Sequence, residues 1–206
     1  MYLKNNIKKL IKERQPFIKN VPSLKSFYSK DEFEEYVNTT TFVLGSNLII
    51  RNKKHTYIWD DKPWSSFENT IPNKILDVIL KEETTLLINC DRASKTIIDF
   101  ISEVQDETNM ITDCHMFYCS KDTEDKGLGR HHDYNDNFMI HIFGKTKVTV
   151  WGKNKIEKVL RPGDIIYVPR KVDHLFESKT ERLSLSFPML YKSKVDKEYN
   201  NNWITI

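Results

Sequence analysis

The second half of the sequence constrains the fold most, because short apolar runs recur there at close spacing. Each run is four to six residues long and rich in β-branched and aromatic side chains. The runs cover residues 114–119, 138–143, 146–151, 156–160, 165–168 and 183–187. Turn signals such as Gly152-Lys153-Asn154 and Pro162-Gly163 separate them. Strands of this length at this spacing are typical of all-β sandwiches and barrels, so the pattern predicts a β core over residues 112–190.

Residues 1–111 have a different texture and are predicted to form a mixed α/β part. Ser29-Lys30-Asp31-Glu32 is a capping box that opens a short helix. Ser94 caps a second helix, whose apolar positions recur with helical spacing. We find no linker, repeat or low-complexity segment, and 206 residues are a usual size for one domain. The prediction is a single domain over 1–206, mostly β with N-terminal helices.

Composition excludes several classes of protein. The 32 basic and 29 acidic residues leave a net charge of +3, which gives no strong nucleic-acid signal. No apolar run approaches the ~18 residues of a membrane span, and the first residues lack the apolar region of a signal peptide. The three cysteines show no metal-site spacing and are expected to be reduced thiols. We therefore expect a cytoplasmic protein, and the sequence is compatible with a homodimer.

Histidine is the informative residue type in the β half. His131, His132 and Asp133 are consecutive and contain the pattern H-x-D. Side chains two apart on a strand point to the same face, so His131 and Asp133 are predicted to reach one metal ion while His132 points away. With His174 as third ligand, two imidazoles and one carboxylate would leave three open positions on Fe(II), enough for a bidentate cosubstrate and O₂. By itself, H-x-D is more often a set of polar surface residues.

The context of His174 strengthens the metal hypothesis. It ends the segment 162–174, PGDIIYVPRKVDH, in which a Pro-Gly turn leads into an apolar strand that Pro169 ends. An H-x-D pattern and a segment such as 162–174, separated in sequence as two strands of one barrel are, rarely occur together by chance. We therefore predict that His131, Asp133 and His174 are both the metal ligands and the catalytic centre.

The segment 131–147, HHDYNDNFMIHIFGKTK, together with 162–174, resembles the cupin-like JmjC family, most of all its ribosomal-oxygenase type. That family shows H-x-D, an acidic residue and Phe, Gly-Lys, and then P-G-D-x-x-Y-x-P before the second His. The residues at the matching places are Asp136, Phe138, Gly144 and Lys145. The resemblance covers 84–187 well and 16–83 loosely. It implies a double-stranded β-helix (cupin, or jelly-roll) core, with Fe(II) and 2-oxoglutarate as cofactors.

The sequence departs from the family at the cosubstrate. The family has a Lys or Arg that pairs with the distal carboxylate of 2-oxoglutarate, and Thr146 stands at that place here. Lys145 and Lys147 flank it, but on a regular strand they point to the other face. The family's Thr before the first His is Leu128. We expect no counterpart of its C-terminal winged-helix part, since about 30 residues follow His174 in the sequence.

A replacement anchor lies nearer the C-terminus. Arg182-Leu183-Ser184 is similar to the R-x-S of other 2-oxoglutarate oxygenases, where Arg and Ser on a late strand bind the distal carboxylate. A guanidinium can make a bidentate, charge-assisted pair with it. We predict Arg182, Ser184, Thr146 and Tyr118 as cofactor-binding residues. The alternative is that Arg182 only opens an ordinary strand. His141 is expected to be a core histidine with satisfied hydrogen bonds.

The resemblance implies an Fe(II)/2-oxoglutarate-dependent dioxygenase, a hydroxylase acting on a protein, peptide or small-molecule C–H bond. Two alternatives stay open. One is another metal-dependent cupin, an isomerase or a cosubstrate-free dioxygenase, which Thr146 favours slightly. The other is a non-catalytic cupin binding module, although three converging ligands have no evident use in such a protein. Metal content and 2-oxoglutarate binding distinguish the three.

Overall fold

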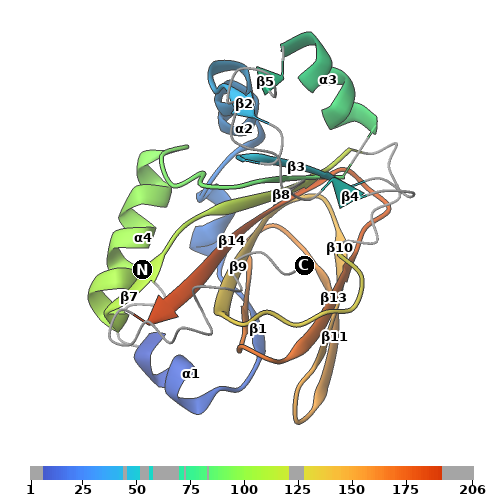
Figure 1. The fold of residues 1–206 in the computed structure, drawn as a ribbon. Coiled ribbons are helices and arrows are strands. Elements are labelled where there is room, and N and C mark those ends of the chain that lie inside the picture. Colours follow the sequence, from blue (N-terminus) through green and yellow to red (C-terminus); the bar gives the residue numbers. More distant parts are fainter. Residues whose placement is uncertain are drawn as a thin grey trace.

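The computed structural model describes residues 7–43, 46–51, 56–57, 70–71, 73–82, 84–120 and 128–191 (Figure 1). Two antiparallel sheets dominate it. The larger has the order β1-β12-β9-β14-β8-β6-β3-β4, and β7 also pairs with β14. Its strands are β1 (Phe17–Asn20), β12 (Asp164–Val168), β9 (Asp136–Phe143), β14 (Arg182–Tyr191), β8 (His115–Cys119), β6 (Thr84–Leu87), β3 (Leu48–Arg51), β4 (Thr56–Tyr57) and β7 (Met110–Thr112).

The smaller sheet faces the inner side of the larger one and completes the jelly-roll core (Figure 1). Its order is β11 (Lys155–Leu160), β10 (Thr146–Trp151), β13 (Asp173–Glu177). His174, the second residue of β13, also pairs with His131 through a single isolated antiparallel bridge. The predicted fold class, mostly β with N-terminal helices around a jelly-roll core, is confirmed.

The helices belong mainly to the N-terminal half. They are α1 (Ile7–Glu13), the 3₁₀ helix η1 (Pro22–Ser26), α2 (Lys30–Thr39), α3 (Asn73–Glu82) and α4 (Lys95–Thr108). A short two-stranded sheet pairs β2 (Phe42–Val43) with β5 (Thr70–Ile71). The predicted capping box at Ser29 is present, and Ser94 accepts a hydrogen bond from the backbone N–H of Ile97. Within the described residues, no helix is long and apolar enough to cross a membrane.

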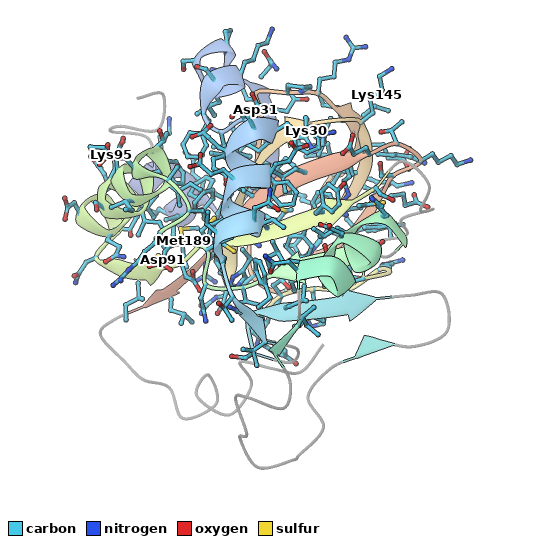
Figure 2. All side chains as sticks on the ribbon, turned by 90° about the horizontal axis from the view of Figure 1, so that it is seen from above. Lys30, Asp31, Asp91, Lys95, Lys145 and Met189 are labelled. Carbon is cyan, nitrogen blue, oxygen red and sulfur yellow. The ribbon has the colours of Figure 1, made fainter. Side chains whose placement is uncertain are left out.

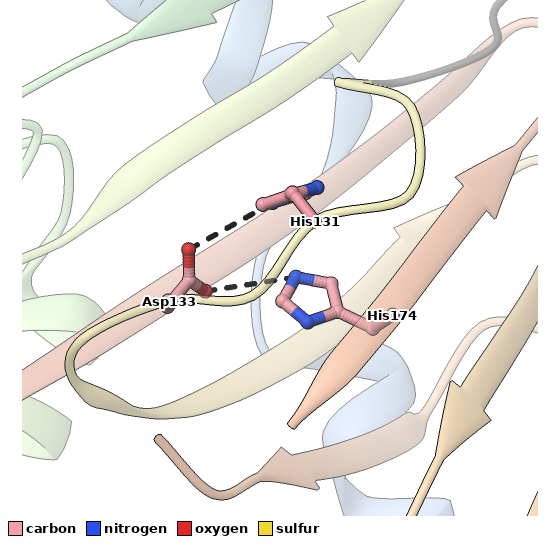
Figure 3. Close-up of side chains that lie close together, drawn as sticks. All are labelled: His131, Asp133 and His174. Atoms are coloured by element: carbon pink, nitrogen blue, oxygen red, sulfur yellow. Dashed lines mark ion pairs between the residues drawn. The ribbon is translucent and has the colours of Figure 1, made fainter. Parts of the chain in front are cut away.

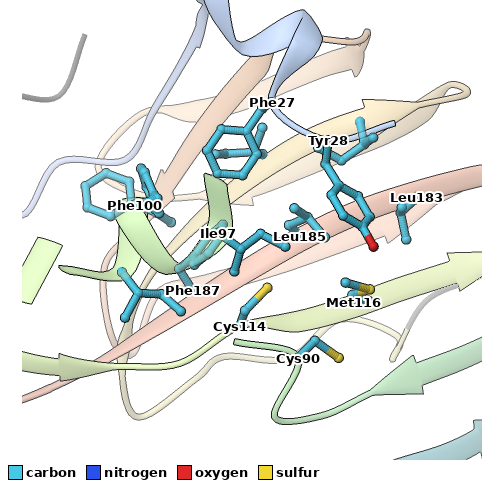
Figure 4. Packing of buried hydrophobic residues seen from close by; sticks show 14 of the residues in the cluster. Phe27, Tyr28, Cys90, Ile97, Phe100, Cys114, Met116, Leu183, Leu185 and Phe187 are labelled. Carbon is cyan, nitrogen blue, oxygen red and sulfur yellow. The ribbon is translucent and has the colours of Figure 1, made fainter. Parts of the chain in front are cut away.

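Alternating side chains of the large sheet divide the interior into two apolar cores. On β14, Leu183, Leu185 and Phe187 pack against the helices together with Phe27 and Phe100 (Figure 4). Their rings form a chain, with centroids 5.5 Å apart for Phe27 and Phe100 and 4.5 Å for Phe100 and Phe187. Burying each of these side chains contributes about 1.5–3 kcal/mol. This core fixes one face of β14.

The second core lies between the two sheets. It consists of Met139, Val148, Val150, Leu160, Ile166, Val168 and Phe176. On the large sheet these residues alternate with the helix-facing ones, so Met139 and His141 point inward while Ile140 and Ile142 point outward. The same alternation turns the polar residues of β14 toward the interior of the barrel. That interior is where the candidate functional residues gather.

Candidate metal centre

His131, Asp133 and His174 converge at one end of the barrel, as Figure 3 shows. One ligand atom from each lies within 4.8 Å of the others. The Asp133 carboxylate stands between the two rings, with Oδ1 3.7 Å from Nε2 of His131 and Oδ2 3.6 Å from Nε2 of His174. Two imidazole nitrogens and a carboxylate gathered in this way are a usual ligand set for a divalent transition-metal ion. The three side chains thus fit around one divalent ion.

Backbone carbonyls orient both imidazole rings. Nδ1 of His131 lies 2.9 Å from the carbonyl oxygen of Gly129, and Nδ1 of His174 lies 3.1 Å from that of Val172. A carbonyl can only accept, so each Nδ1 carries a proton, and in the neutral ring Nε2 then has the lone pair that binds a metal. Such outer contacts fix the tautomer and the ring orientation of metal-binding histidines. Sequence reasoning could not find these carbonyls, because any residue type supplies one.

The backbone of the H-x-D segment differs from the expected strand. His131 makes one antiparallel bridge, through His131 N–H to His174 O at 3.1 Å and His174 N–H to His131 O at 2.7 Å, and residues 132–133 are not in a strand. A further hydrogen bond, from the Lys171 N–H to the Asp133 carbonyl at 2.7 Å, holds the segment. The side chains alternate as predicted: His131 and Asp133 face each other, and His132 points to Asp173.

The triad is partly shielded from water. His174 is buried, whereas the His131 and Asp133 side chains are 25% and 35% exposed. Burial lowers the pKa of His174, which favours the neutral form that a metal ligand needs. One side of the site therefore meets the apolar core between the sheets, and the other is open to solvent.

The interior contains one buried cation. Arg182 is 1% exposed, and among the described side chains it is the only buried lysine or arginine. It opens β14 opposite Cys119, two residues from Ser184, which lies opposite the inward-facing Phe117. Lys145 and Lys147 are exposed, as their strand parity predicted, and Lys145 stands at the periphery in Figure 2. Arg182 is therefore the cation that the fold directs into the barrel.

Thr146 lies at the same end of the barrel as Arg182. Its side chain is fully buried, and its Oγ1 has no hydrogen-bond partner among the described residues. Gly144, two residues earlier, has a φ of +82° and packs so closely on Glu181 and the Arg182 backbone that a Cβ would collide with the Glu181 carbonyl. A buried hydroxyl without a partner costs free energy unless a ligand satisfies it.

Ser184 also faces inward, but its hydroxyl proton is engaged. Its Oγ lies 2.9 Å from Nδ1 of His141, whose Nε2 lies 3.1 Å from the Gly144 carbonyl. The carbonyl only accepts, so Nε2 carries the ring proton and Nδ1 must accept from Ser184. Ser184 therefore has no proton left to donate to a carboxylate. His141 is the satisfied core histidine that the sequence led us to expect.

Burial lowers the pKa of His141 from 6.5 to about 4, with the nearby Arg182 charge acting in the same direction. The unfolded chain therefore binds this proton more readily than the folded chain. The contribution to the free energy of unfolding is complete above pH 6.5 and is lost as the pH falls from 6.5 to 4, by about 3 kcal/mol. In His141→Asn, denaturant unfolding should show a correspondingly shallower fall over this window. Parallel curves for both proteins would contradict this assignment.

Tyr118 lies on the other side of the sheet. Its ring stacks on Phe33 with centroids 4.8 Å apart, and its hydroxyl donates to Glu181 at 3.1 Å. Phe117, its neighbour on β8, is the residue that packs on the inner core. The structure thus brings Arg182, Thr146 and Ser184 to the inner surface and leaves Tyr118 among the helix-facing residues.

Comparison with known proteins supports the resemblance to JmjC domains. A JmjC domain model matches residues 151–196. The ribosomal oxygenase YcfD from Escherichia coli superposes with a TM-score of 0.62 in its complex with cobalt and 2-oxoglutarate, and 0.63 with cobalt and succinic acid. Sequence identity is 15% in both cases. The alignments cover 95% of this chain and 54% of YcfD, so the chain spans about half the length of that protein. No curated protein matches in sequence.

Proposed function

We propose that this JmjC-like protein is an Fe(II)- and 2-oxoglutarate-dependent oxygenase that hydroxylates a C–H bond. The observation that carries the proposal is the shared interior: two Nε2 atoms and a carboxylate converge at one end of the barrel, and the buried Arg182 belongs to the sheet that faces His174. A metal centre alone occurs in many cupins. A buried cation in the same interior favours an anionic cosubstrate in addition.

The donor set suits Fe(II). His131, Asp133 and His174 would hold the ion, and three ligands would leave it able to bind a cosubstrate, as in non-haem iron oxygenases. Iron and 2-oxoglutarate together would supply the activation of O₂ for C–H hydroxylation, with succinate and CO₂ as coproducts. The protein's own part is to present Nε2 of His131 and His174 beside Asp133. Val148, Val150 and Phe176 line the interior near His174 and exclude water from it.

We assign the distal carboxylate of 2-oxoglutarate to Arg182 and Thr146. Burying a carboxylate without a cation is prohibitive, and Arg182 is the buried cation. Thr146 can donate the hydrogen bond that its Oγ1 lacks in the described structure. Ser184 then acts through His141 rather than on the carboxylate itself, because its proton goes to Nδ1. Tyr118 is omitted because it faces the helices.

A protein or peptide side chain is the substrate class we favour, with a small molecule as the second choice. The support is the likeness in fold to YcfD, which is described as a ribosomal oxygenase. The triad is also reachable, since the His131 and Asp133 side chains are a quarter to a third exposed.

Turnover tests the proposal. Purified protein with Fe(II), ascorbate and 2-oxoglutarate should release succinate in air even without substrate, because such enzymes consume the cosubstrate in uncoupled turnover. Asp133→Ala should release none, and Lys145→Ala should match the wild type. If the protein binds metal but neither forms succinate nor binds 2-oxoglutarate, it is better described as another metal-dependent cupin, an isomerase or a cosubstrate-free dioxygenase. The observation that favours this alternative is Thr146 at the place of the family's cation.

A further inference from the structure

The outward-facing residues of the H-x-D segment are joined by one carboxylate. Arg130 donates from Nε to Oδ2 of Asp173 at 2.9 Å, and its Nη2 forms an ion pair with the same oxygen at 2.8 Å. Nδ1 of His132 lies 3.3 Å from the other oxygen, Oδ1. Asp173 directly precedes the ligand His174 in sequence. The same carboxylate therefore links both outward residues of the segment to the start of β13.

A tryptophan supports this arrangement from β10. Trp151 is the cross-strand partner of Asp173, and the Arg130 guanidinium carbon lies 4.3 Å from the centre of its ring. Stacking on the ring, one hydrogen bond and one ion pair hold the guanidinium in one orientation. We call Arg130, Asp173 and Trp151 the outer clamp. It lies on the other side of the backbone from His131 and Asp133.

The segment needs such support, because little regular structure holds it. Among the described residues, its backbone is held by one bridge at His131 and one hydrogen bond to the Asp133 carbonyl, and residues 132–133 lie outside any strand. The distance between the His131 ring and the His174 ring, 4.3 Å between centroids, therefore depends on how firmly the segment is held against β13. The outer clamp adds side-chain contacts at Arg130 and Asp173, which directly precede the ligands His131 and His174 in sequence.

We propose that the outer clamp is a positioning device that raises the affinity of the metal centre. The inference rests on the proposed metal site. Arg130 and Asp173 do not bind the metal in this account; they hold the metal ligands in position. The charges make the idea sharply testable. If Arg130 acted only through its charge, its removal would strengthen the binding of a cation, because like charges repel. If it positions the segment, its removal weakens binding.

The test is a titration of the full chain with Mn²⁺ alone, followed by the electron paramagnetic resonance signal of the free ion. Arg130→Met and Asp173→Asn should each weaken binding about tenfold, the lower end of the effect of outer contacts on metal affinity. The double variant should lose no more than the larger single loss, because both remove the same contact. Lys155→Met is the matched control: it removes a cation 5.9 Å from the Trp151 ring but leaves the clamp intact, and it should bind as the wild type does.

Unchanged or tighter Mn²⁺ binding in Arg130→Met, or single losses that add in the double variant, would overturn the positioning role. The unfolding of the metal-free variants supplies the second measurement. Melting temperatures equal to that of the wild type show that any loss of affinity is local to the segment. If the wild-type protein does not bind Mn²⁺, the proposed metal centre is wrong. If the wild type binds Mn²⁺ and Arg130→Met binds it equally well, only the proposed role of the outer clamp is wrong.

Discussion

Asp133→Ala is expected to abolish measurable Fe(II) binding and all turnover. The carboxylate stands between the two imidazoles and is the only anionic ligand of the triad. Without it, two neutral rings remain, and the charge that offsets the cation is lost. Removing an outer contact of a metal ligand costs up to about 100-fold in affinity, so loss of the ligand itself should exceed that. Calorimetric titration under anaerobic conditions measures the effect.

His132→Ala is the matched control for this substitution. It lies beside Asp133 in sequence, but its side chain points outward to Asp173. It should retain most of the metal affinity, with a loss smaller than that in Arg130→Met. If His132→Ala abolished binding and His131→Ala did not, the assignment of the inward-facing residue would be wrong.

Arg182→Ala should raise the concentration of 2-oxoglutarate needed for half-saturation by about 100-fold or more. The distal carboxylate would then be buried without its cation, and breaking a buried charge pair costs about 3–5 kcal/mol. Fe(II) affinity should stay nearly unchanged, because Arg182 acts at the cosubstrate and not at the triad. Separate titrations with Fe(II) and with 2-oxoglutarate measure the two affinities.

Because Arg182 is buried, a second variant guards against loss of the fold. Arg182→Met keeps an unbranched stem and removes the guanidinium with its charge and its N–H donors, and it should show the same selective loss of 2-oxoglutarate affinity. Lys145→Ala removes an exposed cation from the neighbouring turn and should leave both affinities unchanged. Wild-type 2-oxoglutarate affinity in a folded Arg182→Met protein would contradict the anchor.

The barrel could be predicted from sequence because most of its strands carry short apolar runs at close spacing. The runs at 138–143, 146–151 and 165–168 correspond to β9, β10 and β12. The strand that carries His174 was not among the predicted runs. In β13, Asp173, His174 and Glu177 interrupt the apolar pattern, and its pairing with β10 fixes it in place. A short strand held by its neighbours leaves little local signal.

The positions of the site residues were predictable only as far as strand parity determines them. Parity placed His131 and Asp133 inward, Lys145 and Lys147 outward, and Arg182 with Ser184. It could not reveal that Ser184 donates to His141, because that contact joins β14 to β9 across the sheet. The carbonyls that fix the two histidine tautomers leave no trace in the sequence either, since they belong to the backbone.

One spectroscopic titration tests the central claim most directly. Under anaerobic conditions, Fe(II) is added to the protein and 2-oxoglutarate follows, while the visible spectrum is recorded. We predict that a metal-to-ligand charge-transfer band will appear only when Fe(II), 2-oxoglutarate and wild-type protein are all present. It should be absent in Asp133→Ala and should require far more 2-oxoglutarate in Arg182→Met. A wild-type protein that binds Fe(II) but develops no such band at saturating 2-oxoglutarate would contradict the account.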